Sequence, residues 1–288
     1  MLRNYLSLVK FSHTIFALPF ALAGFFIAWR QKMEPFDWFL LLKVLACMVF
    51  ARSAAMAFNR WLDRDIDARN PRTAIREIPA GVISARSAFV FVVVNCLAFV
   101  AMASLINPIC GWLSPLALAV VLGYSYTKRF TWLCHFVLGL GLGLAPVGAF
   151  LAVSGHFAWI PMLLGLAVLT WVAGFDIIYA LQDEGFDRSQ GLQSIPAFWG
   201  KTRALRLSEG LHLLTAGLIL AAIYLLKLEN SGLGWLHLAG TMVFLLMLFY
   251  QHTLVKPTDL SRVNLAFFTT NGVASVVFGG CLILDLLF

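Results

Sequence analysis

Charged residues are scarce in this chain: Asp, Glu, Lys and Arg make up 12% of its 288 residues, whereas hydrophobic residues make up 61%. A soluble globular protein is typically about 25% charged and about 45–50% apolar. With a mean hydropathy of +0.86, the chain holds more apolar surface than a soluble core of its size can bury. This composition excludes a soluble enzyme, a disordered protein and a disulfide scaffold, and it indicates a polytopic membrane protein.

Metal-binding cysteine patterns are absent as well. The five cysteines form no CxxC pair and no Cys/His spacing, and all of them lie in apolar stretches, where cysteine behaves as a small buried hydrophobe. The net charge is +7, but in a membrane protein the position of the cations matters more than their sum. We therefore expect a lipid bilayer and no nucleic acid as partner, and no protein partner is evident.

Nine apolar runs approach the roughly 20 residues that a helix needs to cross a bilayer. They cover residues 12–29, 36–58, 87–105, 109–126, 131–152, 158–181, 206–227, 232–251 and 265–287. The runs are too long for transmembrane strands and lack period-two alternation. The sequence predicts an all-α bundle of nine transmembrane helices, organised as a single transmembrane domain over residues 1–288.

Basic residues gather on one side of this predicted topology. The N-terminal segment and the loops after the second, fourth, sixth and eighth runs carry 16 of the 21 Lys and Arg residues. Cytoplasmic loops are the ones that carry such an excess. We predict a multi-pass protein of the cell membrane, and of the inner membrane in a bacterium, with its N-terminus in the cytoplasm. The long polar segments 59–86 and 182–205 then face the cytoplasm too.

Half of the acidic residues lie in two patches at the ends of even-numbered runs. In the first patch, Asn59, Asp63 and Asp67 follow i, i+4, i+8 spacing, which stacks three oxygen ligands on one helix face. Carboxylates at this spacing repel one another, so something must offset the repulsion. Oxygen ligands suit Mg²⁺, which typically binds one or two carboxylates together with substrate phosphates. The patch therefore predicts a site for a Mg²⁺-bound diphosphate.

The second patch repeats this spacing with Tyr179, Asp183 and Asp187, and Asp183 follows Asp63 by 120 residues. Both patches close a run on the predicted cytoplasmic side, so the chain reads as two pseudo-repeated halves. The alternative is a solvated helix end whose acids pair with nearby arginines. That alternative is favoured for the two acids that lie off the shared faces, Asp65 and Glu184.

Two ionisable residues lie within the apolar runs. Asp176 precedes Asp183 by about two helical turns, and Arg52 precedes Asn59 by the same interval. An ionisable group at membrane depth is costly and marks a candidate functional site. Each is a candidate catalytic residue here, and the alternative for each is a structural ion pair.

The loop after the fourth run reads Gly-Tyr-Ser-Tyr-Thr-Lys-Arg over residues 123–129. Lys128 and Arg129 are placed to neutralise diphosphate oxygens, or they serve only as topology signals. The rings of Tyr124, Tyr126 and Tyr179 are candidates to line an apolar cavity and face a cation, although plain packing is the alternative for each. His13 is isolated, which favours a packing role.

These motifs resemble those of a known family. Residues 59–67 match the NxxxDxxxD motif of the UbiA intramembrane prenyltransferases, and residues 176–187 are similar to that family's DxxYxxxDxxxD motif. Residues 124–129 resemble its YxxxKR loop, with Ser125 where many members have Pro. The paired motifs are specific, and the nine-run pattern extends the resemblance over the whole chain. Within the family, the chain looks most like the 4-hydroxybenzoate polyprenyltransferase branch and its relatives in the futalosine route to menaquinone.

The resemblance implies a reaction and assigns roles. A polyprenyl diphosphate loses diphosphate with the help of Mg²⁺, and a ring carbon of an aromatic acceptor attacks the allylic cation, as in ubiquinone or menaquinone biosynthesis. The implied metal ligands are Asp63, Asp67, Asp183 and Asp187, and the implied catalytic residues are Asp176, Asn59 and Arg52. The implied substrate-binding residues are Lys128, Arg129, Tyr124, Tyr126 and Tyr179.

Other functions stay open at this point. Another acceptor, such as haem, a chlorin or homogentisate, is compatible with the same motifs. The CDP-alcohol phosphotransferases require a DGxxAR pattern, which the Ala68-Arg69 segment lacks. A transporter of divalent cations or organic anions would suit Asp176 at membrane depth and the two halves, but the acids cluster at one face, and broken-helix signals at the midplane are missing from both halves.

Overall fold

A computed structural model describes residues 2–9, 16–230 and 232–288 of the chain, and these contain helices and no β-strand. The predicted all-α fold is therefore confirmed for the described residues. The chain divides into two compact units. The first unit comprises Met1–Thr14 and Asp37–Thr127, and the second comprises Ile15–Phe36 and Lys128–Phe288.

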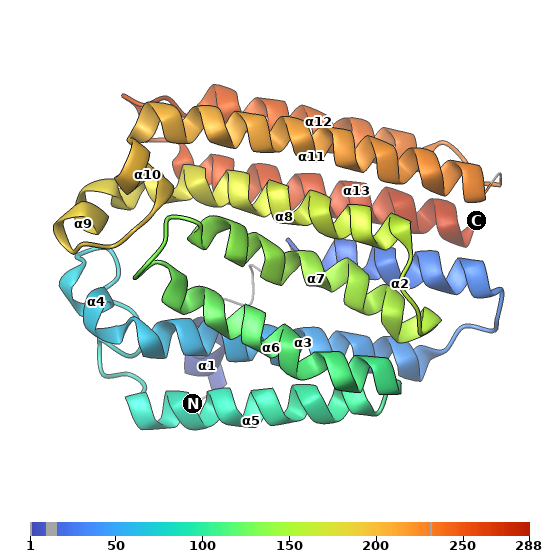
Figure 1. Cartoon of the computed structure of the whole chain (residues 1–288), viewed down its shortest axis with the longest axis horizontal. Coiled ribbons are helices and arrows are strands. Elements are labelled where there is room, and N and C mark those ends of the chain that lie inside the picture. The colour runs from blue at the N-terminus through green and yellow to red at the C-terminus, as the bar shows by residue number, and fades with distance from the viewer. Residues whose placement is uncertain (1, 10–15, 231) are drawn as a thin grey trace. The chain divides into compact units, whose positions relative to one another are not determined.

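The first unit is built on three long helices (Figure 1). Helix α3 packs against α5 and α6, and the short α1 packs against α3. Side-chain caps begin two of the long helices: Asp37 accepts a hydrogen bond from the N–H of Leu40, and Ser84 accepts one from the N–H of Ser87. The helices are α1 (Leu2–Leu8), α3 (Trp38–Leu62), α4 (Arg64–Arg69), α5 (Ala85–Ser104) and α6 (Pro108–Thr127).

In the second unit, α8 packs against α7 and α11 (Figure 1). Helix α2 packs against α7 and α13, and α12 packs against α13. The long helices of this unit are α2 (Leu18–Lys32), α7 (Cys134–Ser154), α8 (Trp159–Ala180), α11 (Lys201–Glu229), α12 (Leu236–Leu254) and α13 (Thr270–Leu287). Its short elements are a 3₁₀ turn (Leu181–Asp183), α9 (Glu184–Ser189), α10 (Ile195–Trp199) and a π-helical turn (Leu265–Thr269).

Seven helices in the described part of the chain are long and apolar enough to cross a membrane. They confirm a multi-pass membrane bundle and match seven of the nine predicted runs; the other two runs correspond to α2 and α12. The first of those runs lies partly among the undescribed residues 10–15, together with His13, and α2 has 15 residues. Helix α12 has 19 residues, but His237, Gln251 and His252 make it less apolar. The count of nine membrane spans therefore stays a prediction.

Large apolar side chains point outward from these helices. Trp112, Leu213 and Phe249 are each more than 70% exposed. A soluble protein avoids a surface of this kind, whereas in a bilayer such side chains contact lipid. The exposed apolar side chains and the composition of the chain both indicate that lipid surrounds the long helices.

An aromatic cluster lies in the core of the second unit. The ring of Trp171 on α8 packs against Phe20 and Phe244 with centroid distances of 5.4 Å, and Phe278 packs against both phenylalanines. The indole Nε1 of Trp171 donates a hydrogen bond of 2.9 Å to Oδ1 of Asn271 on α13. These contacts hold the middle of α8, which carries Asp176 in its last two turns.

Helices α7 and α8 approach each other closely through glycine. A Cβ atom added to Gly139 on α7 would lie 2.3 Å from the carbonyl oxygen of Leu169 on α8. A Cβ atom added to Gly148, also on α7, would meet nothing within 4 Å. Small residues that let backbones come together are typical of helix interfaces in membranes.

These two glycines make a matched pair for a stability test. Gly139→Ala is expected to destabilise the protein by about 1–3 kcal/mol, because α7 and α8 must move apart to admit the methyl group. Gly148→Ala is expected to be neutral or to stabilise by about 0.5–1 kcal/mol, because it only reduces backbone freedom in the unfolded chain. Thermal unfolding in detergent measures both. Equal midpoints for the two variants would show that this helix contact does not limit stability.

Candidate active site

The first acidic motif spans the junction between α3 and α4. Asn59 lies in the last turn of α3, Asp63 caps that helix with φ −90° and ψ 6°, and Asp67 lies in α4. The prediction of one continuous helix through the motif is therefore wrong. The spacing survives nevertheless, because the N–H of Asp63 bonds to the carbonyl of Asn59 and the N–H of Asp67 bonds to that of Asp63.

The second acidic motif has the same local form. Helix α8 ends at Ala180, a 3₁₀ turn ends at Asp183, and α9 carries Asp187. A continuous helix is again wrong, because the tighter 3₁₀ turn interrupts it. Asp183 has φ −100° and ψ 2°, close to the values at Asp63. The first carboxylate of each motif thus stands at the start of a short helix, and the second is buried one turn later, as expected for related halves.

Asp67 is buried and paired with a cation. Its carboxylate oxygens each lie 2.7 Å from Nη1 of Arg76, and its carbonyl accepts a hydrogen bond from the hydroxyl of Thr73. Its side chain is 7% exposed. Sequence reasoning missed Arg76, because this arginine stands among many others in the loop and its distance of nine residues from Asp67 matches no simple periodicity. The ion pair satisfies one carboxylate of the motif within the protein.

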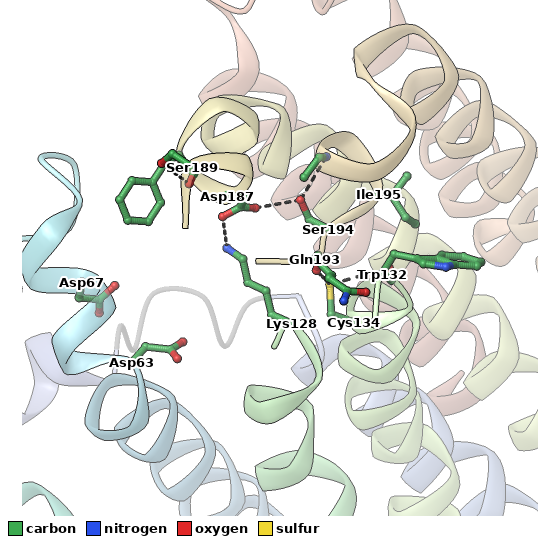
Figure 2. A network of polar contacts seen from close by, with 12 residues as sticks. Asp63, Asp67, Lys128, Trp132, Cys134, Asp187, Ser189, Gln193, Ser194 and Ile195 are labelled. Carbon is green, nitrogen blue, oxygen red and sulfur yellow. Dashed lines mark hydrogen bonds and ion pairs between the residues drawn. The ribbon is translucent and has the colours of Figure 1, made fainter. Parts of the chain in front are cut away.

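Asp187 is completely buried and is held from two sides, as Figure 2 shows. Nζ of Lys128 lies 2.7 Å from its Oδ1, and the hydroxyl of Ser194 donates a 2.8 Å hydrogen bond to its Oδ2. Burial opposes the charge on Lys128, but the carboxylate of Asp187 outweighs it, so the pKa of Lys128 is raised above its ordinary value. Lys128, one of the two cations predicted to bind diphosphate, thus pairs with a residue of the second acidic motif. Arg129, the next residue in the chain, is half-buried.

The other carboxylate of each motif is more accessible. Asp63 and Asp183 are half-buried. The amide of Asn59 lies 3.3 Å from Oδ2 of Asp63 and 3.5 Å from the hydroxyl of Ser125. The third predicted motif therefore meets the first one at Ser125. Asp63 and Asp183 are thus more exposed than Asp67 and Asp187.

The acids off the shared faces form local ion pairs. Asp65 lies 3.9 Å from Arg64 at the surface, and Glu184 lies 3.1 Å from Arg188 and 3.8 Å from Lys201. This agrees with the solvated helix end expected for Asp65, whereas the side chain of Glu184 is only 14% exposed. Exposed pairs of this kind contribute little to stability.

Asp176 faces a histidine that sequence reasoning missed. Its Oδ2 lies 2.7 Å from Nδ1 of His135 at the start of α7. The ring is 3% exposed, whereas the Asp176 side chain is 23% exposed. A single histidine at the edge of an apolar run gave no signal of a partner 41 residues away. The pairing supports the expectation that a charge at this depth has a partner.

The remaining predicted residues occupy varied settings. Arg52 is half-buried on α3 and lies within electrostatic range of Tyr124 on α6. Tyr126 is 45% exposed, and the ring of Tyr179 packs on Phe267 with a centroid distance of 4.2 Å. Their roles toward a substrate stay predictions, and for Tyr179 the structure shows ordinary ring packing.

Arg60 is a second residue that sequence reasoning missed. It is 5% exposed at the end of α3, and no hydrogen-bond partner for its Nη1 exists in the described part of the chain. Asp67, Arg76 and Glu77 lie within electrostatic range. The first unit therefore places two cations, the buried Arg60 and the half-buried Arg76, beside its acidic motif, and both can bind anionic oxygens.

Comparison with known proteins finds similarity over most of the chain. The model of the UbiA prenyltransferase family matches residues 17–273. A 4-hydroxybenzoate octaprenyltransferase of Cupriavidus metallidurans is 28% identical over 98% of this chain and 94% of its own length. One of Yersinia pseudotuberculosis is 31% identical over 81% of this chain and 79% of its own length.

A solved structure shares the fold as well. The apo structure of a UbiA homolog from Aeropyrum pernix K1 superposes with a TM-score of 0.83 at 36% identity, covering 95% of this chain and 98% of that one. The UbiA homolog from Archaeoglobus fulgidus, in a structure bound to GPP and Mg²⁺, superposes with a TM-score of 0.75 at 21% identity, covering 99% and 100%.

The buried ion pair at Asp187 generates a stability prediction. Lys128→Ala is expected to destabilise the protein by about 2–3 kcal/mol, because it leaves a buried carboxylate without its cation. Lys201→Ala removes a longer, more exposed pair from the same region and is expected to cost less than about 1 kcal/mol. Unfolding in detergent with EDTA measures both variants.

A double variant checks the cause of that effect. Asp187→Asn in the Lys128→Ala background is expected to restore part of the lost stability, because the buried charge is removed with its partner. If the double variant is less stable than Lys128→Ala, the loss has another origin than the unpaired carboxylate.

Proposed function

The chain belongs to the UbiA prenyltransferase family, and on that premise we propose that it transfers a polyprenyl group from a polyprenyl diphosphate to the ring of an aromatic acceptor. The acceptor is 4-hydroxybenzoate or a related quinone precursor, in ubiquinone or menaquinone biosynthesis. The enzyme is thus an aromatic polyprenyltransferase, and it acts at the cytoplasmic face of the cell membrane. The names of the curated relatives support this acceptor class.

The observation that carries the proposal is the pair of acidic motifs with one geometry. In each motif one carboxylate is buried against a cation, Asp67 against Arg76 and Asp187 against Lys128. The other carboxylate of each motif, Asp63 or Asp183, is half-buried. Such a motif keeps one acid for structure and offers the other to a ligand. Diphosphate chemistry with Mg²⁺ needs carboxylates of this second kind.

The residues present fit Mg²⁺ held together with substrate phosphates. The donors are carboxylate and amide oxygens, which Mg²⁺ prefers. Within the described residues no three His, Cys, Asp or Glu side chains come together as a metal cage. Mg²⁺ typically keeps several waters and binds one or two carboxylates together with substrate phosphates. We assign Asp63 and Asp183 as metal ligands, with Asp67 and Asp187 behind them. When bound, Mg²⁺ neutralises charge on the departing diphosphate.

The cations and the amide then take roles toward the diphosphate. Lys128 and Arg129 supply positive charge for its oxygens, with Lys128 tethered by Asp187. Asn59, whose amide contacts Asp63, orients that carboxylate or the acceptor. Arg52 lies two turns deeper on α3 and is assigned to the acceptor. Tyr124, Tyr126 and Tyr179 are proposed to bind substrate.

Asp176 is proposed to act at the aromatic ring. Loss of diphosphate leaves an allylic carbon that a ring carbon attacks, and the ring then releases the proton of that carbon. A carboxylate beside the ring stabilises the developing positive charge or accepts the proton. The side chain of Asp176 is the accessible end of its pair with His135, which suits this role.

Other acceptors and another class of function are weighed against the same site. Haem, a chlorin or homogentisate would use the same diphosphate residues, and product analysis decides among these acceptors. A transporter is disfavoured by membership in a prenyltransferase family. No observation on the described residues favours transport over transfer.

The decisive experiment follows a prenylated aromatic product by mass spectrometry with purified protein, prenyl diphosphate and 4-hydroxybenzoate. Activity is expected to vanish in EDTA and to return with Mg²⁺. Asp63→Asn and Asp183→Asn are each expected to lower turnover at least about 10²-fold while the protein stays folded, because a metal ligand is lost. Asp65→Asn, a surface acid of the same segment, serves as the control and keeps its activity. Full activity after EDTA treatment would refute the metal assignment.

Asp176→Asn separates the ring chemistry from the diphosphate. We expect turnover to fall about 10²–10⁴-fold, as for loss of a general base, while Mg²⁺-dependent binding of prenyl diphosphate stays nearly unchanged. Affinity and turnover are measured on one folded preparation. If both fall together, Asp176 belongs with the metal ligands, and if neither falls, it is structural.

A further inference from the structure

The ring of His135 combines three features. It is 3% exposed, it contacts a carboxylate that lies within a membrane helix, and it contacts Ile195 at the start of α10, whose neighbour Ser194 bonds to Asp187 of the second acidic motif. We propose that His135 is a positioning residue that holds Asp176 for its role at the aromatic ring. This inference rests on the proposed function.

The first step concerns which ring nitrogen carries the proton. The backbone N–H of Ile195 donates to Nε2 of His135 over 3.3 Å. Because Nε2 accepts this bond, the proton of the neutral ring is on Nδ1. Nδ1 therefore donates to Oδ2 of Asp176 over 2.7 Å. The contact with Ile195 therefore makes His135 a hydrogen-bond donor to the carboxylate of Asp176.

The second step concerns what this donor does to Asp176. The hydrogen bond from Nδ1–H holds the carboxylate of Asp176 in one orientation. It also occupies Oδ2, which leaves Oδ1 as the oxygen that can meet a ligand. The ring is buried while the carboxylate is 23% exposed. The pair therefore presents a carboxylate of set orientation, and the imidazole stays behind it.

The third step links this pair to the diphosphate side of the same unit. Ser194, next to Ile195, donates to Asp187, and the N–H of Gln193 donates to the carbonyl of Lys128 over 2.8 Å. Figure 2 shows Lys128 and Ser194 on either side of Asp187, with Ile195 beside Ser194. Residues 193–195 thus contact both the Lys128–Asp187 ion pair and the ring that orients Asp176. This short segment therefore fixes the positions of Asp176 and Asp187 relative to each other.

The chemistry balances without another reactant. The C–H bond at the attacked ring carbon breaks, its electron pair restores aromaticity, and the proton moves to the Asp176 carboxylate. His135 takes up no proton from the aromatic ring, because its Nε2 is engaged by Ile195 and its Nδ1 already carries a proton. Its contribution is therefore orientation of the acceptor of that proton, and it forms no bond to substrate.

Two substitutions at His135 isolate this contact. Asn places an N–H donor close to the position of Nδ1, whereas Leu fills a similar volume without any donor, and both lose the contact with Ile195. His135→Leu is expected to lower kcat about 10–100-fold, the usual cost of losing an outer hydrogen-bond partner. His135→Asn is expected to retain kcat within about threefold. The KM for prenyl diphosphate and the unfolding midpoint are measured for both. His156→Leu, at an exposed loop, is the control and is expected to match wild type.

A double variant shows whether His135 acts through Asp176. In the Asp176→Asn background, His135→Leu is expected to lower kcat by less than about twofold further, because the residue that it positions is already disabled. A further loss as large as in the wild-type background would overturn the proposal. Equal losses in His135→Leu and His135→Asn would also overturn it, because the histidine would then support only the fold or the loop.

The outcomes also separate this inference from the proposed function. If wild-type protein with Mg²⁺ yields no prenylated product from any aromatic acid tested, the proposed function fails, and this inference fails with it. If wild type is active and His135→Leu has normal kcat, only the role of His135 is refuted.

Discussion

Two buried carboxylates impose the main constraint on this structure. A carboxylate out of contact with water is costly unless a cation and hydrogen bonds compensate it. Asp187 is therefore tied to Lys128 and Ser194, and Asp67 is tied to Arg76. Each of these ion pairs holds a segment between two helices against one of the acidic motifs. The residues held in this way are Arg76 in the first unit and Lys128 and Ser194 in the second.

The membrane helices provide the frame on which those segments stand. In a bilayer the backbone must satisfy its hydrogen bonds internally, so helices are the available elements and small residues let them approach. Gly139 brings α7 against α8, and Trp171 holds α8 in the core of the second unit. The same two helices carry His135 and Asp176. Close packing of α7 against α8 thus sets the distance between His135 and Asp176, on which the proposed ring chemistry depends.

Much of the fold followed from apolar run length alone, because a span needs about 20 apolar residues whatever its neighbours are. The motif spacing likewise located the carboxylates, since i and i+4 positions stay adjacent across the breaks at Asp63 and Asp183. The breaks themselves were not predictable. Helix termini depend on which local hydrogen bonds win at a polar stretch, and the residue types permit either a continuous helix or a turn.

By itself, the sequence determined the solvent of this protein, its all-α class, its family and the identity of the acids in each motif, because these properties depend on composition and on local spacing. Only the tertiary structure decided which acids are fully buried and which are partly exposed. Arg76 and His135 have no periodic relation to Asp67 and Asp176, so their pairing emerges only when loops and helices pack. Burial and partner choice are properties of packing, and packing therefore gives carboxylates of the same local spacing different degrees of exposure.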